Sequence, residues 1–161
     1  MKQVKFQALV NWVRENGGYV DKDVYMDDDS FLRVRKSKLY GEVLLRIPQE
    51  CTIQSKGILG QTIKLLNEFS KGKNSFYFPY IDSLPDMKDH PFLKYSQDDI
   101  IEIQKISNNC GQLLNEFYTE LYTLQNALSK LSIQLPELYQ SEEWLKYAIV
   151  ITHKYGMHNH F

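Results

Sequence analysis

Apolar residues near the N-terminus recur at the spacing of one helix face. The triplet Asn16-Gly17-Gly18 follows them directly. Glycine adopts the left-handed backbone conformation that ends a helix without steric strain. The sequence therefore predicts a short helix that ends near residue 16, with a buried face formed by Phe6, Leu9, Val10 and Val13.

Between residues 19 and 47 the apolar pattern changes to a period of two, which is typical of strands. An acidic run, Asp27-Asp28-Asp29, and the pair Tyr40-Gly41 interrupt this region as turns. We expect short strands joined by local hairpins into a small antiparallel sheet. The apolar residues of these strands are Val20, Val24, Met26, Leu32, Val34 and the block from Val43 to Ile47.

Helical spacing returns after Gly57 to Gly60 and continues along most of the remaining chain. Ser96 and Asp99 match a capping signal, and the apolar stripe that follows runs from Ile103 to Leu131. One unbroken helix from the Ser96 cap to the end of this stripe would be about 50 Å long. The stripe is wide, which favours packing in a globular bundle over a coiled-coil dimer. A final helix is expected from Ser141 to Ile151.

Composition excludes several classes of protein. The length of 161 residues corresponds to one domain, and the formal net charge of -1 is spread without a basic stripe, so nucleic-acid binding has no electrostatic support. The N-terminus lacks the unbroken apolar core of a signal peptide, and no apolar run reaches the roughly 20 residues that span a bilayer. Cys51 and Cys110 form no metal or disulfide motif, so we expect both to be core side chains in a reducing, intracellular compartment, cytoplasmic or nuclear.

One segment carries a more specific pattern. Residues 65–85, LLNEFSKGKNSFYFPYIDSLP, pass from an amphipathic helix through a Lys/Gly break into an aromatic block closed by Leu84-Pro85. Together with other positions, this segment resembles the split SET-domain protein methyltransferases, the family of the Rubisco large-subunit lysine methyltransferase and the actin-histidine methyltransferase. The other positions are Phe6, Trp12, Asn16-Gly17-Gly18 and the block from Gly41 to Pro48.

The resemblance implies an α+β fold with an incomplete SET core of short antiparallel strands and a predominantly helical insert. It assigns residues 1–56 to the N-terminal part of the core, 57–140 to the helical insert and 141–161 to the start of the C-terminal half. The chain stops at Phe161, near the point where the family places its Asn-His pair and late tyrosine. We therefore assign no catalytic residue and expect this chain to be inactive by itself.

The cofactor implied by the resemblance is S-adenosylmethionine. The Gly-x-Gly turn of the family maps onto Asp29-Ser30-Phe31, so both glycines are replaced, and Asp28 stands where the family often has an acidic residue. The second contact maps to Thr152-His153, where His153 replaces an arginine. The candidate cofactor-binding residues are Asp28, Asp29, Ser30 and His153. An ordinary acidic turn between two strands is the alternative for the first three.

Aromatic residues suggest a second part of the site. Tyr80, within the block that the family packs beside its substrate cleft, and Tyr155, after the Thr-His pair, are candidate cleft residues. As a bare pattern, such aromatic blocks belong to the core more often than to a cleft. The C-terminal histidines, His158 and His160, lack a nearby third ligand, so no metal site is predicted.

Two functions remain open. The first is a protein-lysine or protein-histidine N-methyltransferase of the SET class, and the second is a protein-binding module of SET ancestry without turnover. Either would act on a protein substrate or partner. We also expect self-association through unpaired strand edges. Arg33 and Arg35 share a strand face, which is expected to be solvated.

Overall fold

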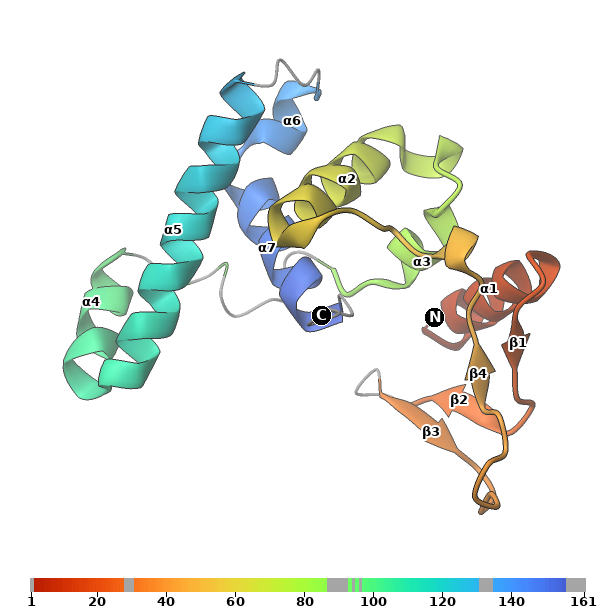
Figure 1. Ribbon diagram of the computed structural model, residues 1–161. Coiled ribbons are helices and arrows are strands. Elements are labelled where there is room, and N and C mark those ends of the chain that lie inside the picture. The colour runs from red at the N-terminus through yellow and green to blue at the C-terminus, as the bar shows by residue number, and fades with distance from the viewer. Residues whose placement is uncertain are drawn as a thin grey trace. The chain divides into compact units, whose positions relative to one another are not determined.

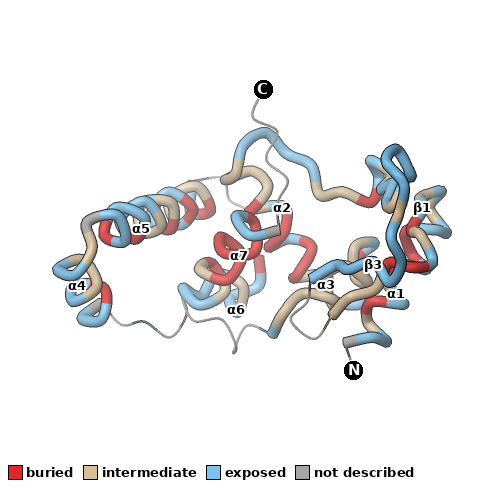
Figure 2. Tube along the Cα trace, turned by 90° about the horizontal axis from the view of Figure 1, so that it is seen from below, coloured by how far each residue is buried: buried red, intermediate tan, exposed pale blue. Residues whose placement is uncertain are grey.

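The computed structural model describes residues 2–27, 31–86, 93, 95, 97–130 and 135–155. Over these residues the chain consists mainly of helices, with two short antiparallel strand pairs near the N-terminus (Figure 1). The predicted α+β class is confirmed at this level. Buried positions recur at helical spacing along most helices, whereas every residue from Tyr147 to Thr152 is buried (Figure 2).

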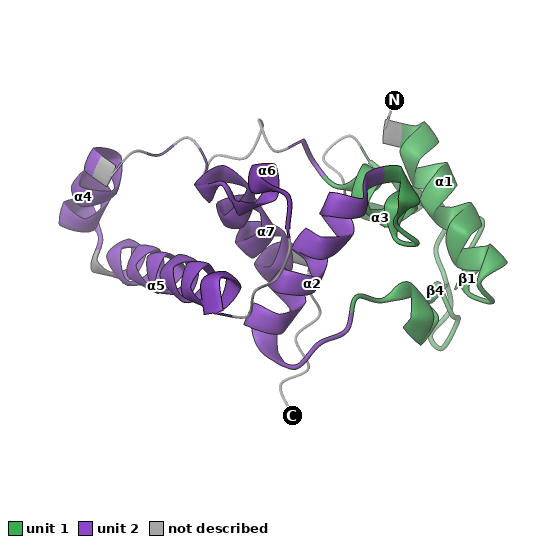
Figure 3. Cartoon of the chain, turned by 90° about the horizontal axis from the view of Figure 1, so that it is seen from above, with its two compact units in different colours: residues 1–53, 73–84 green, residues 54–72, 85–161 purple. Residues whose placement is uncertain are grey.

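The chain divides into two compact units (Figure 3). Unit 1 comprises residues 1–53 and 73–84, and unit 2 comprises residues 54–72 and 85–161. Each unit is therefore built from two separate stretches of chain. This division cuts the sequence at other points than the segments 1–56, 57–140 and 141–161 implied by the family resemblance, which remain predictions.

Unit 1 begins with helix α1 (Lys2–Glu15), which ends as predicted. The amide of Gly18 donates to the carbonyl of Val13, and the amide of Gly17 donates to that of Arg14, at 2.9 and 3.0 Å. Gly17 has a φ of 82°, so this is a Schellman turn. A Cβ on Gly18 would lie 2.5 Å from Cγ1 of Val13 and 2.8 Å from the carbonyl oxygen of Arg46, so only glycine fits.

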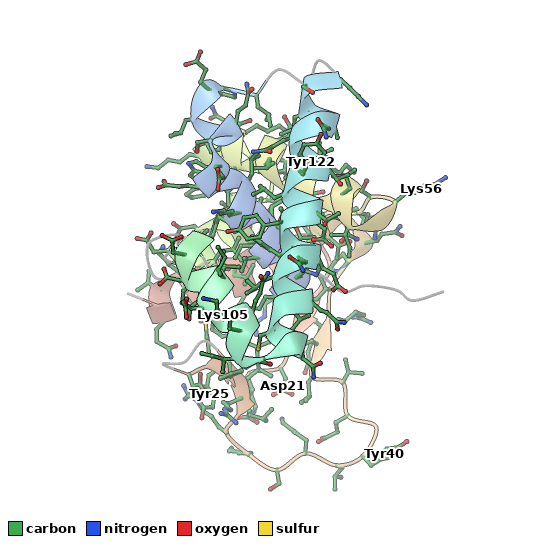
Figure 4. All side chains as sticks on the ribbon, turned by 90° about the vertical axis from the view of Figure 1, so that its left-hand side faces the viewer. Asp21, Tyr25, Tyr40, Lys56, Lys105 and Tyr122 are labelled. Carbon is green, nitrogen blue, oxygen red and sulfur yellow. The ribbon has the colours of Figure 1, made fainter. Side chains whose placement is uncertain are left out.

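Four short strands follow, in two separate pairs rather than the single small sheet expected. Strand β1 (Tyr19–Val20) pairs antiparallel with β4 (Leu45–Arg46), and β2 (Val24–Met26) pairs antiparallel with β3 (Leu32–Val34). The connection from β3 to β4 is exposed, and the side chain of Tyr40 projects from its tip (Figure 4). The predicted strand positions are correct. The expected pairing by local hairpins holds for β2 and β3, whereas β1 pairs with the distant strand β4.

The core of unit 1 forms between α1, the strands and the aromatic block. The 3-10 helix η1 (Gln49–Cys51) adds the buried Cys51, and helix α3 (Phe78–Ser83) follows a second 3-10 helix, η2 (Gly72–Asn74). Trp12 makes edge contacts with Phe76 and Tyr77, at centroid distances of 5.3 and 6.2 Å. The buried cluster comprises Phe6, Val10, Trp12, Val13, Val20, Val24 and Cys51.

The described residues of unit 2 form helices and the loops that connect them. Helices α2 (Gly57–Lys71), α5 (Asn108–Lys130) and α7 (Glu142–Tyr155) surround its core, with the short helix α6 (Glu137–Gln140) beside α7. The buried cluster comprises Leu66, Leu121, Leu124, Leu128, Leu135, Leu145, Ala148 and Ile149. Phe69 and Trp144 extend this cluster with a ring contact at 5.2 Å.

The single long helix predicted after residue 97 is wrong. Helix α4 (Gln97–Ile106) ends before Ser107, and α5 begins at Asn108, with the two helices folded back beside each other (Figure 1). Gly111 allows this close approach, since a Cβ there would lie 3.0 Å from Cγ of Gln104. Cys110, at the start of α5, is exposed, so the prediction that both cysteines are core side chains is correct for Cys51 alone.

Candidate functional site

A small cleft in unit 2 lies between α2, α5 and α7 and has a volume of about 170 Å³. Aliphatic side chains form much of its wall, and Glu120 is the charged residue among those that line it. Several threonines complete the wall. The lining residues are Ile58, Leu59, Thr62, Thr119, Glu120, Thr123, Leu124 and Ile149.

The threonines of the cleft use their hydroxyl groups within their own helices. Thr119 Oγ1 donates to the carbonyl of Asn115 at 2.8 Å, and Thr123 Oγ1 donates to the carbonyl of Thr119 at 2.7 Å. Such bonds to the preceding turn are common for helical threonine. A ligand in the cleft would therefore contact the methyl groups of these threonines, and their hydroxyl oxygens could accept hydrogen bonds from it. Neither hydroxyl is free to donate a hydrogen bond to the ligand.

A buried pair of threonines joins α2 to α7 beneath the cleft. Thr62 Oγ1 lies 3.2 Å from Thr152 Oγ1, and the Thr152 hydroxyl donates to the carbonyl of Ala148 at 2.8 Å. Thr152 is the first member of the Thr-His pair to which the family resemblance assigns a cofactor contact. Thr152 is 5% exposed and its hydroxyl hydrogen is engaged within α7, so it presents no free donor to a ligand.

His153, the second member of the pair, lies in the last turn of α7 and contacts α5. Its Nε2 atom is 2.6 Å from Oε2 of Glu120, and the two side chains are 43% and 37% exposed. The family resemblance assigns His153 to the binding of S-adenosylmethionine. The position beside His153 already holds a carboxylate, which would repel the carboxylate of the cofactor. This contact works against a cofactor at His153, and the assignment stays a prediction.

The other predicted site residues are placed as follows. Asp28, Asp29 and Ser30 lie outside the described residues, and Tyr155 is the last residue of α7, without a described side chain. Tyr80 belongs to α3 in unit 1, where it packs against the core cluster around Trp12. Tyr80 is partly buried there, and its assignment to a substrate cleft stays a prediction. His153 is the one predicted cofactor residue with a described side chain.

Sequence reasoning missed a charged cluster in unit 1. Lys38 Nζ lies 2.9 and 3.0 Å from the two carboxylate oxygens of Asp21 and 2.9 Å from Oδ2 of Asp23. The Asp23 amide, which donates to Asp21 at 2.8 Å, and Lys38 lower the pKa of Asp21. Hydrogen bonds from Lys38 lower the pKa of Asp23, and those to Asp21 and Asp23 raise the pKa of Lys38.

In this cluster one ammonium group bonds to two carboxylates, so each charged group has a partner while the cluster keeps a net charge of -1. It ties the exposed connection after β3 to the segment between β1 and β2. The alternation of Asp21 and Asp23 was visible in the sequence, yet nothing local indicated a partner 15 to 17 residues later. Within the described ranges, no group of three His, Cys, Asp or Glu side chains could hold a metal ion. His158 and His160 lie outside those ranges.

Comparison with known proteins identifies no protein similar to this chain. No protein-family model matches this chain, no curated protein is significantly similar to it, and no solved structure matches it significantly. Among the described helices, none is both long and apolar enough to cross a membrane. The function of this chain is therefore inferred from the sequence resemblance and from the contacts of the candidate site residues.

Proposed function

We propose that this chain belongs to the lineage of SET-domain proteins that methylate lysine or histidine side chains of proteins with S-adenosylmethionine. The observation that carries the proposal is the order of elements. A helix closed by a two-glycine turn precedes short antiparallel strand pairs, and helices follow from α2 onward. This order is the one that the family resemblance implies for residues 1–140.

We further propose that this chain does not transfer methyl groups by itself. Phe31 occupies the position of the second glycine in the family turn, and His153 is engaged by Glu120. Both features work against cofactor binding, the first by bulk and the second by charge.

The pairing of His153 with Glu120 favours the second function, a protein-binding module of the same ancestry. In this proposal the ancestral role of His153 was to bind the cofactor. In this chain its bond to Glu120 instead stabilises the packing of α7 on α5. Exposed apolar side chains of unit 1 are available to a partner. They include Leu39, Tyr40 and Val43, which are 79%, 108% and 57% exposed.

Two measurements test these proposals. Calorimetric titration with S-adenosylmethionine measures cofactor binding, and incubation of a mixed protein extract with labelled cofactor measures transfer. We expect no incorporation above a control without the protein. Robust incorporation that depends on His153 or Tyr155 would contradict the proposed inactivity. Weak cofactor binding would support the lineage, whereas no binding at millimolar cofactor favours the binding module.

A Glu120→Gln variant sharpens the cofactor measurement. If a cofactor carboxylate approaches His153, removal of the Glu120 charge should tighten binding by about fivefold, the effect of one exposed charge pair. Glu116→Gln, one turn earlier on α5, removes the same charge from a residue that does not contact His153 through any described bond. Equal affinities for both variants and for the wild-type protein would place the cofactor away from His153.

A further inference from the structure

Among the described residues, no strand pairs with the outer edge of β3, and the pairing of β2 with β3 shows which backbone groups form that edge. The amide of Arg35 donates to the carbonyl of Asp23, and the amide of Asp27 donates to that of Phe31, both at 2.9 Å. In an antiparallel pair, hydrogen-bonded and non-hydrogen-bonded residue pairs alternate. The pairs Val24–Val34 and Met26–Leu32 are therefore non-hydrogen-bonded. The amide and carbonyl groups of Leu32 and Val34 point away from β2.

These outward groups have no backbone partner among the described residues. All residues from 31 to 37 are exposed, including Leu32 at 50% and Val34 at 37% (Figure 2). An exposed strand edge of this kind is a template for an additional strand. The two faces of β3 differ in polarity and charge, and this difference indicates which side chains a partner strand would carry on each face.

The apolar face of β3 continues the core face of β2. Leu32 and Val34 stand opposite Met26 and Val24, and Val24 is buried in the core of unit 1. Because Leu32 and Val34 remain exposed, an added strand could cover them with apolar side chains. Side chains on alternate residues of that strand would point to the same face.

The other face of β3 is basic. Arg33 lies opposite Tyr25, and the guanidinium of Arg35 lies 5.3 Å from the Tyr25 ring centroid, so both arginines share this face. Arg33 bonds to Asp27 at 2.8 Å, whereas Arg35 enters no ion pair among the described residues. Lys36, in the bend after β3, likewise enters no ion pair among those residues and adds positive charge beside this face. An added strand would therefore be stabilised by acidic side chains on this face.

A second copy of this chain fits the edge poorly. If two β3 strands paired antiparallel through the outward groups of Leu32 and Val34, Arg33 of one copy would lie directly opposite Arg33 of the other. Like charges at opposed positions destabilise a strand pair. The expected self-association therefore finds no support at this edge.

We propose that β3 binds an extended peptide segment of a partner protein in which acidic and apolar residues alternate, by adding it as a third strand beside β2 and β3. The partner's apolar residues cover Leu32 and Val34, and its carboxylates meet Arg33 and Arg35. This inference deepens the binding-module function and rests on it. It does not require cofactor binding, so the S-adenosylmethionine titration and the peptide titration can fail separately.

The test uses the full chain and a synthetic peptide of alternating glutamate and valine, titrated by calorimetry or fluorescence anisotropy. Two control peptides replace the glutamates by lysines, or carry N-methyl groups on the amides that would bond to β3. We expect binding of the acidic peptide alone. Equal binding of the lysine peptide, or of the N-methylated peptide, would contradict the proposal, as would no binding at millimolar peptide.

Variants locate the peptide on the protein. Arg35→Glu with Lys36→Glu should weaken binding by about tenfold. The matched control, Lys56→Glu with Lys73→Glu, changes the net charge equally at exposed lysines outside β3 and should leave binding unchanged. Val34→Pro removes an outward amide that does not bond to β2 and should weaken binding by about fivefold. Circular dichroism checks that each variant is folded.

Equal losses in both charge-reversal pairs would indicate nonspecific attraction and overturn the proposal. Sedimentation of the wild-type protein and of Val34→Pro completes the test. Concentration-dependent dimers that disappear in Val34→Pro would identify a second copy as the occupant and also overturn it.

Discussion

The imidazole of His153 and the carboxylate of Glu120 join the last turn of α7 to the middle of α5, with Nε2 and Oε2 2.6 Å apart. Both residues remain partly exposed, so solvent weakens the interaction.

The first prediction concerns this pair. His153→Ala should lower the free energy of unfolding by up to about 1 kcal/mol, as for a partly exposed ion pair. Glu120→Ala should lower it similarly, and the double variant by less than the sum of the two. Urea denaturation of the four proteins gives the coupling energy. Glu116→Ala, combined with His153→Ala in the same way, serves as the control and should give additive effects.

The second prediction concerns pH. In the folded protein the pKa values of Asp21 and Asp23 are lowered, so their contribution to stability is present above pH 4 and is lost as the pH falls through the folded values. The pKa of Lys38 is raised, so its contribution is lost only at alkaline pH. Lys38→Met should therefore lower the thermal midpoint at pH 7.

Below about pH 4 the difference between Lys38→Met and the wild-type protein should shrink, because both carboxylates become protonated. Thermal unfolding from pH 2 to pH 8 measures this dependence. Lys36→Met is the control, since Lys36 acts on Asp23 only through its charge at a distance. A destabilisation by Lys38→Met that does not change with pH would show that packing of its aliphatic stem dominates.

The third prediction concerns Trp12. Its Nε1 atom is buried and has no hydrogen-bond partner among the described residues. Trp12→Phe removes this unpaired donor together with some packing, so it should lower the free energy of unfolding by no more than about 1.5 kcal/mol. Trp12→Ala should lower it by about 3–5 kcal/mol. Denaturation followed by circular dichroism compares them. Equal losses would indicate that the indole N–H has a partner.

The fourth prediction concerns the two thiols. Cys110 is exposed, while Cys51 is buried at 8% exposure and burial raises the pKa of its thiol. The thiolate is the reactive form, so both effects protect Cys51. Ellman's reagent at pH 8 should label one thiol rapidly and the other only when unit 1 opens. In a Cys110→Ser variant the fast phase should disappear. Two fast phases in the wild-type protein would contradict the burial of Cys51.

The sequence was most informative where structure is local. The helix stop at Gly17 depends on one backbone conformation, and the strand positions depend on two-residue alternation, so both could be predicted. The break at Ser107 could not, because α4 and α5 each bury an apolar face and the stripe continues across the turn.

The contacts of the candidate site residues were harder to predict from the sequence, because they are not local. The contact of His153 with Glu120 joins residues 33 positions apart on different helices, and Lys38 meets two carboxylates across an irregular connection. Composition and spacing carry no information about such pairings. These pairings follow from how the elements of each unit pack against one another, and apolar side chains elsewhere determine that packing.

The chain passes between units 1 and 2 three times, after residues 53, 72 and 84. During synthesis on the ribosome, the core of unit 1 therefore cannot be completed when β4 emerges, since Tyr77 and Tyr80 come more than 20 residues after Cys51. Until then Trp12 lacks its aromatic neighbours and remains a target for chaperones. Because of these crossings, no single proteolytic cut separates the residues of unit 1 from those of unit 2, so limited digestion should yield nicked molecules that stay together rather than separate fragments.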